Sequence, residues 1–208
     1  MHRKFCKGKC ASFWQVADQG EPRELTDPAA LKALAHPLRR RILRQLDRAG
    51  PATSTTLARA LGENTGATSY HLRQLAEHGF VVDVPDKGQG RERWWQAKRQ
   101  DIRFPPRSTM SADMRATFEE FTRQGVAEDI EAFARFREQR DAMGEWSDGL
   151  LFSRGSLSLT KDELMQFWAD YMELLRRYIA AHDPPTPGAR RLLVRFVAFP
   201  DVDPRSDK

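Results

Sequence analysis

The amino-acid sequence predicts a mainly helical α+β fold, built from a compact N-terminal domain and a helical C-terminal unit with a few strands. Apolar side chains recur at helical spacing over most of the chain, and short β-branched and aromatic segments interrupt that pattern. Charge also divides the chain, because residues 1–103 hold 19 Lys and Arg against 11 Asp and Glu, whereas residues 104–208 hold 15 against 18. The two differences, +8 and −3, add up to the net charge of +5.

The first 26 residues form a basic leader with no sustained period, and we expect either a mobile leader that stands apart from the fold or an adapter to a partner subunit. Cys6 and Cys10, the two cysteines of the chain, both lie there, so no disulfide framework is expected. Together with His2 they could supply three ligands to a soft metal ion, whereas a closed structural zinc site takes four. Free thiols are the favoured interpretation, metal or redox sensing is the alternative, and no cofactor is predicted.

Three helices are predicted before residue 62. Asp27 and Pro28 form a typical cap and first-turn pair, and Pro37 ends the helix that they start. The second helix covers residues 38–49, and the third covers residues 54–61 after a run of hydroxyl side chains. The side chains of the second helix that we expect mostly outward are Arg39, Arg40, Arg44 and Arg48.

A fourth helix, from Asn64 to His78, has one apolar face and one face of small polar groups, Tyr70 and Arg73. Its inward stripe consists of Thr68, Leu72, Leu75 and Ala76. Its outer face consists of Gly66, Tyr70, Arg73, Gln74 and Glu77, flanked by Thr65, Ala67, Ser69 and His71. The stripe can pack on a core while the outer face stays available to a partner.

A β-hairpin is predicted directly after this helix, which Gly79 ends. Residues 80–84 alternate with period 2, and residues 92–97 supply the returning strand. The basic side chains around the glycine-containing tip are Lys87, Arg91 and Arg93. Because Trp94 and Trp95 point to opposite faces of a strand, at least one of them is expected in the core.

The connection between the third and fourth helices, residues 62–64, is short and contains a glycine. The two helices should therefore cross at a wide angle, as in a helix-turn-helix. Three helices, a helix-turn-helix and a hairpin over residues 27–97 make a winged helix, and we place the end of this domain at residue 103.

The C-terminal unit, residues 104–208, is expected to begin with a linker. Consecutive prolines, Pro105 and Pro106, favour an extended chain over residues 102–110. A long helix with an irregularity at Gly125 is predicted over residues 111–143.

A strand, a helix and a second strand are predicted next. Residues 150–159 alternate well enough for a strand, and Thr160 with Glu163 forms a capping box for a helix that extends through Ala181. Residues 191–200 form the final strand. The aromatic side chains of this unit could line a cavity for a small apolar effector, although a filled core or dimer seam is favoured. They are Trp146, Phe152, Phe167, Trp168, Tyr171 and Tyr178.

Four segments of the chain occur in the order and at the spacing found in ArsR-like winged-helix transcriptional regulators. The sequence resembles this family, especially its longer form, which is common in actinobacteria. The four segments are ALAHPLRRRIL, LARALG, TGATSYHLRQLAEHGFV and GRERWW. The resemblance implies a dimer on an operator of two half-sites, with residues 65–73 in the major groove and Arg91 or Arg93 near the backbone or minor groove. The metal-sensing members of that family carry cysteines or histidines where this chain has STTLARAL, which puts metal sensing in doubt.

We therefore expect a sequence-specific double-stranded DNA-binding transcriptional regulator, a homodimeric repressor on an inverted-repeat operator. Arginine can bond guanine bidentately, and hydroxyls can bond bases or phosphates. The candidate DNA-binding residues are Ser54, Thr65, Gly66, Ala67, Ser69, Tyr70, His71, Arg73, Lys87, Arg91, Arg93 and Arg40. The alternative for each is a solvated surface residue or, for Tyr70 and His71, packing on the neighbouring helix.

Two other classes of protein compete with this interpretation. A winged helix can serve as a protein-binding adapter that docks on a transcription factor with little affinity for DNA. An enzyme is not expected, because the sequence has no phosphate loop, no HExxH and no GxSxG. No apolar run approaches the ~20 residues that a membrane span needs, so a cytoplasmic location without a membrane partner is expected.

Overall fold

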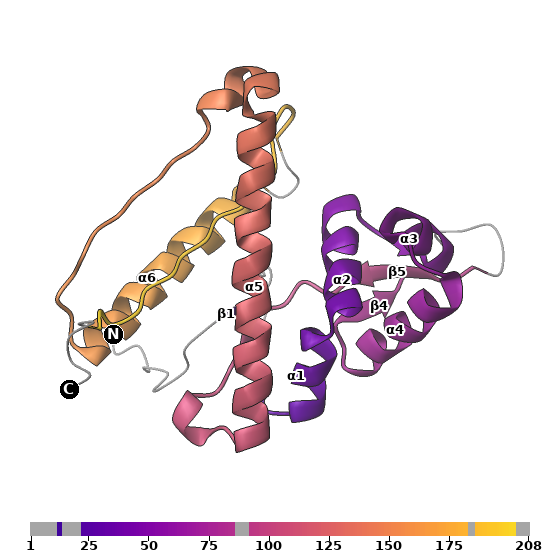
Figure 1. Cartoon of the computed structure of the whole chain (residues 1–208), viewed down its shortest axis with the longest axis horizontal. Coiled ribbons are helices and arrows are strands. Elements are labelled where there is room, and N and C mark those ends of the chain that lie inside the picture. The colour runs from indigo at the N-terminus through magenta and orange to yellow at the C-terminus, as the bar shows by residue number, and fades with distance from the viewer. Residues whose placement is uncertain (1–11, 14–21, 86–91, 183–185, 203–208) are drawn as a thin grey trace.

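A computed structural model describes residues 12–13, 22–85, 92–182 and 186–202 of the 208. It is mainly helical with short strands, as the sequence predicts. A long helix, α5, runs through the molecule, with the N-terminal helices on one side of it and the last helix, α6, on the other (Figure 1).

Four helices make up most of the N-terminal domain. They are α1 (Pro28–Ala35), α2 (Pro37–Ala49), α3 (Ser54–Leu61) and α4 (Thr65–Glu77). The Asp27 carboxylate accepts hydrogen bonds from the amides of residues 29 and 30 at 2.9 and 3.2 Å, which fixes the start of α1. The sharp turn between α3 and α4 depends on Gly62, whose φ of +67° lies in the left-handed region that favours glycine. All four predicted helices are confirmed.

Two small sheets accompany these helices. The first has the order β3-β5-β4 and is antiparallel throughout, with β3 (Ala52–Thr53), β4 (Val81–Asp83) and β5 (Trp94–Ala97). It contains the predicted hairpin, and Trp95 is buried on it, as expected of at least one of the two tryptophans.

The second sheet draws on the leader. It has the order β1-β6-β2, with β1 (Ser12–Phe13), β2 (Arg23–Glu24) and β6 (Ile102–Arg103). β1 pairs antiparallel to β6 and β2 pairs parallel to it. Leu25, next in the chain, is buried in the core, so the described part of the leader packs with the fold instead of standing apart from it.

The predicted linker over residues 102–110 is wrong. Ile102, Phe104 and Met110 are all buried in one core with the N-terminal helices. The Phe104 ring lies 4.9 Å from Phe118 and 5.6 Å from Phe121 on α5. The prolines do keep the chain extended, but the apolar side chains beside them find a surface to cover, so the core crosses the expected boundary at residue 103.

The C-terminal part holds η1 (Arg107–Thr109), α5 (Ala112–Gln139), η2 (Arg140–Asp148) and α6 (Lys161–Ala180). α5 passes through the buried Gly125 without a break, and the regular helix ends at Gln139 instead. The capping box of Thr160 and Glu163 is confirmed at the start of α6.

The two strands predicted in this part are wrong. Residues 150–159 and 191–200 adopt no regular secondary structure, and every side chain of residues 151–160 is exposed. A strand forms only where a neighbouring strand accepts its backbone hydrogen bonds, and the alternating pattern cannot supply that neighbour by itself.

Candidate nucleic-acid interface

Helix α4 is anchored by its inner face. Thr68, Leu72 and Leu75 are fully buried, which confirms the predicted inward stripe. The side chain of Asn64 accepts a hydrogen bond from the Ala67 amide at 2.7 Å, and the Thr68 hydroxyl donates to the Asn64 carbonyl at 3.0 Å. Cap and stripe together hold the helix in a fixed orientation on the domain.

The outer face of α4 is largely exposed. Thr65, Gly66 and Arg73 are exposed, and Tyr70 is 53% exposed. Ala67 and Ser69 are half-buried on the flank. The guanidinium Nε of Arg73 donates to the carbonyl of Ser69 at 3.3 Å, so this side chain lies along the helix surface. The result is a row of hydroxyl, phenol and guanidinium groups on one rigid helix.

His71 lies at the edge of this face but turns inward. Its ring centroid is 4.5 Å from that of His36, and its Nδ1 is buried with no hydrogen-bond partner among the described residues. Burial, then the positive charges of His36 and Arg39, lower the pKa of His71, while Glu63 acts in the opposite direction. The ring is therefore favoured as a neutral packing group, which is the alternative that the sequence left open for this residue.

His36 fixes the other half of this pair. Its Nδ1 accepts a hydrogen bond from the Leu38 amide at 3.2 Å and so caps α2. Burial and the charge of Arg39 lower its pKa as well. A neutral His36 suits this cap, because a protonated Nδ1 can no longer accept a hydrogen bond.

The strands that lead to the hairpin tip lie next to the start of α3. Thr55 Oγ1 donates to Glu92 Oε1 at 3.1 Å, and Ser54 is half-buried beside it. The exposed Arg93 pairs with Asp83 Oδ2 at 2.9 Å and lies 5.4 Å from the Trp95 ring centroid. Of the predicted tip residues, Lys87 and Arg91 lie outside the described residues, as do Cys6 and Cys10 of the leader.

The arginine run on α2 serves the fold. Arg39 donates to the carbonyl oxygens of Ala33 and Lys32 at 2.7 and 2.9 Å, which satisfies the C-terminus of α1. Arg41 pairs with Glu63 at 2.7 Å and donates to the carbonyl of Leu61 at the end of α3.

Arg40, expected outward as a phosphate contact, is fully buried, and that prediction is wrong. Glu128 on α5 accepts from its Nε and Nη2 at 3.0 and 2.6 Å, and the guanidinium lies 4.8 Å from the Phe121 ring centroid. Arg44 also pairs with Glu128, at 2.7 Å. Arg40 precedes the buried Leu43 by three residues, so it lies on the apolar stripe of α2, a signal that could have predicted its burial.

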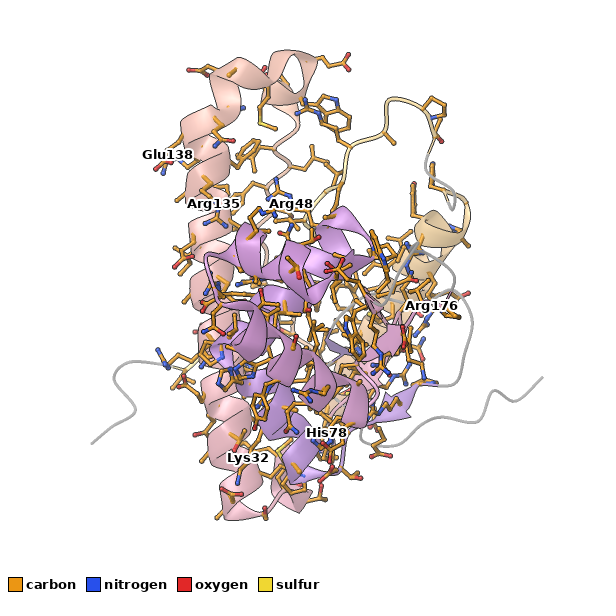
Figure 2. All side chains as sticks on the ribbon, turned by 90° about the vertical axis from the view of Figure 1, so that its right-hand side faces the viewer. Lys32, Arg48, His78, Arg135, Glu138 and Arg176 are labelled. Carbon is orange, nitrogen blue, oxygen red and sulfur yellow. The ribbon has the colours of Figure 1, made fainter. Side chains whose placement is uncertain are left out.

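Figure 2 views the molecule with the N-terminal domain toward the reader, and it separates two groups of charged side chains. Lys32 and His78 lie near the N-terminal end of α5, where Lys32 pairs with Asp113 at 2.8 Å. Arg135 and Glu138 lie near the other end of α5, on its exposed surface. The charges of Arg135 and Glu138 therefore lie at the opposite end of α5 from Lys32 and His78.

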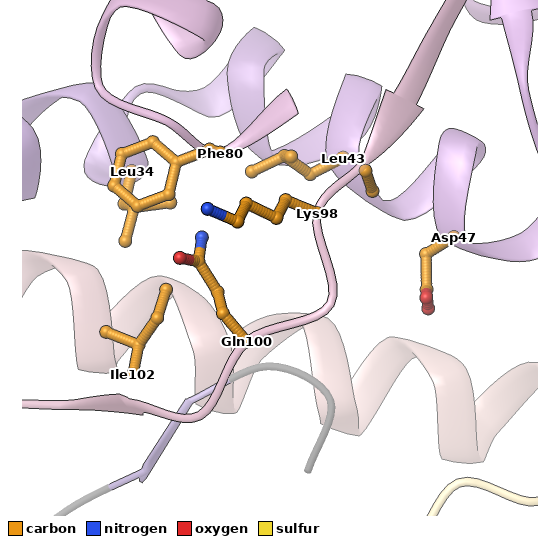
Figure 3. A pocket seen from close by; sticks show the side chains of 8 residues that line it. Leu34, Leu43, Asp47, Phe80, Lys98, Gln100 and Ile102 are labelled. Carbon is orange, nitrogen blue, oxygen red and sulfur yellow. The ribbon is translucent and has the colours of Figure 1, made fainter. Parts of the chain in front are cut away.

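The structure gives no support to an effector cavity lined by the C-terminal aromatic residues. Phe167, Trp168 and Tyr171 pack on Phe196, with ring centroids 4.6 to 5.6 Å from it. A cavity between α1, α2 and β5 is shown in Figure 3; its volume of about 20 Å³ suits about one water molecule. Its lining residues are Leu34, Leu43, Asp47, Phe80, Ala97, Lys98, Gln100 and Ile102.

Within the described ranges, no group of three or more His, Cys, Asp or Glu side chains is placed to hold a metal ion. None of the described helices combines the length and apolar character that a membrane crossing requires.

Comparison with known proteins agrees with this geometry. A family model described as a helix-turn-helix domain matches residues 34–84, a segment that contains α2, α3, α4 and β4. No curated protein matches the chain. The four helices, the turn at Gly62 and the hairpin after α4 define the class: the chain carries a winged helix-turn-helix domain.

The chain is also similar to several solved structures. The antimony-specific transcriptional repressor AntR is 22% identical over 50% of this chain and 78% of its own, with a TM-score of 0.33. An ArsR family transcriptional regulator is 26% identical over 51% and 93%, with a TM-score of 0.30. The Zα domain of PKZ from Carassius auratus, in complex with Z-DNA, is 21% identical over 29% and 92%, with a TM-score of 0.26. Similarity at this level defines no ligand for this chain.

Proposed function

We propose that the protein is a sequence-specific double-stranded DNA-binding transcriptional regulator that acts in the cytoplasm as a homodimeric repressor. In this proposal α4 lies in the major groove, and the basic wing at Lys87 to Arg93 follows the backbone. The observation that carries it is the outer face of α4, where Thr65, Tyr70 and Arg73 project from a helix whose opposite face is fully buried. A helix held in this way can present side chains to base edges without further ordering.

The charge distribution supports a polyanionic partner. Residues 1–103 carry a net charge of +8, from 19 Lys and Arg against 11 Asp and Glu, and residues 104–208 carry −3. Although Arg39, Arg40 and Arg41 are used within the fold, Arg73 and Arg93 are exposed around α4 and the wing. Neutralisation of phosphates by such groups supplies most sequence-independent affinity for DNA.

Two copies are part of this proposal because one short helix contacts few base pairs. Two recognition helices related by two-fold symmetry read half-sites about one helical turn apart, which multiplies the discrimination between sequences. Selection of bound duplexes from a random pool should therefore return an inverted repeat. A selected site without symmetry, or no enrichment at all, would count against the proposal.

The salt dependence of binding separates a regulator from a protein-binding adapter. Binding to the selected duplex should weaken steeply as salt rises from about 50 to 200 mM, because released counterions carry much of the affinity. An adapter would show little duplex affinity at any salt concentration and salt-tolerant capture of a protein partner.

A further inference from the structure

The connection between η2 and α6 is an extended segment with an apolar surface of its own. We define the arm as residues 150–159; it runs apart from the helices on its way to α6 (Figure 1). Leu151 is 94% exposed, and Phe152, Leu157 and Leu159 are exposed as well. Ordinary connecting loops carry polar side chains, so four large exposed apolar groups in ten residues require a reason.

A second segment has the same character on one of its faces. We define the strip as residues 191–199, in which Phe196 packs on the rings of α6. The other large apolar side chains of the strip are exposed; they are Leu192, Leu193, Val194, Val197 and Phe199. Apolar residues at both odd and even positions are typical of a strand that is covered on both faces. In a single copy Phe196 alone among these large apolar side chains is covered.

The strip is held in place by its charged residues. Arg191 donates to the Asp47 carbonyl at 2.7 Å and pairs with the Asp47 carboxylate, and Arg195 pairs with Asp129 at 2.5 Å. Both arginines are thus directed toward α2 and α5. The strip consequently presents its exposed apolar side chains at a defined position on the molecule.

The amount of exposed apolar surface matches a protein interface. From their exposed fractions, the large apolar residues of the arm and the strip present roughly 1,000 Å² per copy. Each partner of a stable complex buries about 800 Å². The two segments together therefore expose enough apolar surface for a stable interface.

We propose that the arm of each copy packs on the strip of a second copy of this chain, so that the C-terminal halves of two copies complete one another. Fully extended, the ten residues of the arm span about 33 Å, enough to reach a neighbouring subunit. A second copy covers the arm and the strip in one symmetric step, because each copy brings one of each. A different protein would need two separate apolar surfaces to do the same.

This inference rests on the proposed function for the requirement of a dimer, and it adds which segments form it. Sedimentation of the full-length chain tests it. An arm variant that combines Leu151→Ser, Phe152→Ser and Leu157→Ser should raise the dimer dissociation constant at least about 100-fold. The matched control combines Ser153→Ala, Ser156→Ala and Ser158→Ala in the same segment and should leave the constant unchanged.

Folding does not obscure the result, since the three apolar side chains are exposed in the single chain and their replacement should leave the helical circular dichroism of the monomer intact. A wild-type chain that sediments as a monomer overturns the inference. So does an arm variant that dimerises as tightly as the wild type.

Crosslinking tests which segments meet. In a background with Cys6→Ser and Cys10→Ser, one chain carries Leu157→Cys and another carries Val197→Cys, and the two are mixed and treated with a short bis-maleimide. Crosslinks between the two different chains support the pairing of arm and strip, and their absence overturns it. If the dimer and the crosslink are found but no duplex is bound, the proposed function fails while this inference stands.

Discussion

The two halves of the molecule differ in how well a single chain covers its own apolar residues. From Leu25 to Phe121 the apolar side chains form one core, and even a guanidinium, that of Arg40, is fully buried and paired. From residue 149 onward most side chains are exposed, including Leu151 and Phe199. The first half buries its apolar side chains within a single chain. The second half is also rich in apolar side chains, but a single chain leaves most of them exposed.

The boundary between the covered and the exposed half of the chain therefore does not coincide with the end of the helix-turn-helix domain. The winged helix depends on α5, because Arg40 and Phe104 have their partners there. The helix-turn-helix domain and α5 therefore share one core.

Truncation should have the largest effect on stability, and it tests where the covered half of the chain ends. A chain that ends at Asp148 keeps the whole core and should show cooperative urea unfolding as a monomer. A chain that ends at Arg103 loses Phe104, Met110 and Phe121 from the core and should not unfold cooperatively. A stable, cooperative fragment of residues 1–103 would contradict the assignment of α5 to the first half.

Removal of one buried partner tests the same division with a single residue. Glu128→Ala leaves the buried Arg40 without its counter-charge and should lower the free energy of unfolding by about 3 kcal/mol. The matched control is Glu131→Ala on the same helix, whose exposed pair with Arg135 at 3.7 Å should matter by less than about 0.5 kcal/mol. Equal losses in urea titrations would mean that α5 is not joined to α2 as described.

The histidine pair should give a smaller, pH-dependent effect within the first half. Folding lowers the pKa of His36 and of His71 from the ordinary value of 6.5, so below that pH the unfolded chain binds more protons than the folded one. Their contribution is complete above about pH 6.5 and is lost as pH falls toward the folded pKa values.

The check is a comparison of unfolding free energies between pH 7 and 5. The double variant His36→Asn with His71→Gln should lose stability less steeply than the wild type, since asparagine can keep the cap on α2 without titrating. The control His182→Gln, exposed beyond α6, should follow the wild-type curve. Parallel curves for the wild type and the double variant would rule out the histidine pair as the source of the slope.

Local chemistry made the first half predictable from the sequence. Caps such as Asp27 and Asn64, the breaks at Pro37 and Gly62, and the inward stripe of α4 act over a few residues, and the structure has all of them. The burial of Arg40 was missed because it depends on Glu128, 88 residues further along the chain. The supposed linker was misjudged because its apolar side chains pack on α5, whose inner face the local pattern of residues 102–110 does not contain. The apolar spacing around Leu43 and Phe104 predicts burial only if a second packing surface, here that of α5, is assumed.

The second half was predicted less well for a related reason. The capping box at Thr160 is local and is confirmed, whereas the strands over residues 150–159 and 191–200 are not formed in the single chain. Their alternation indicates that these segments can pack against another apolar surface. It does not indicate whether that surface lies in the same chain or, as we propose, in a second copy.

If α4 reads DNA sequence as we propose, the Arg73→Ala variant should lose sequence discrimination. On the selected duplex this variant should lose about 1 to 3 kcal/mol of specific binding and tolerate any base at one position of each half-site. Arg91→Ala should weaken all duplexes about equally, and Arg135→Ala, on distal α5, should change neither. If instead Arg73→Ala and Arg91→Ala reduce binding equally on every sequence, with no relaxed position, α4 is not the helix that reads the groove.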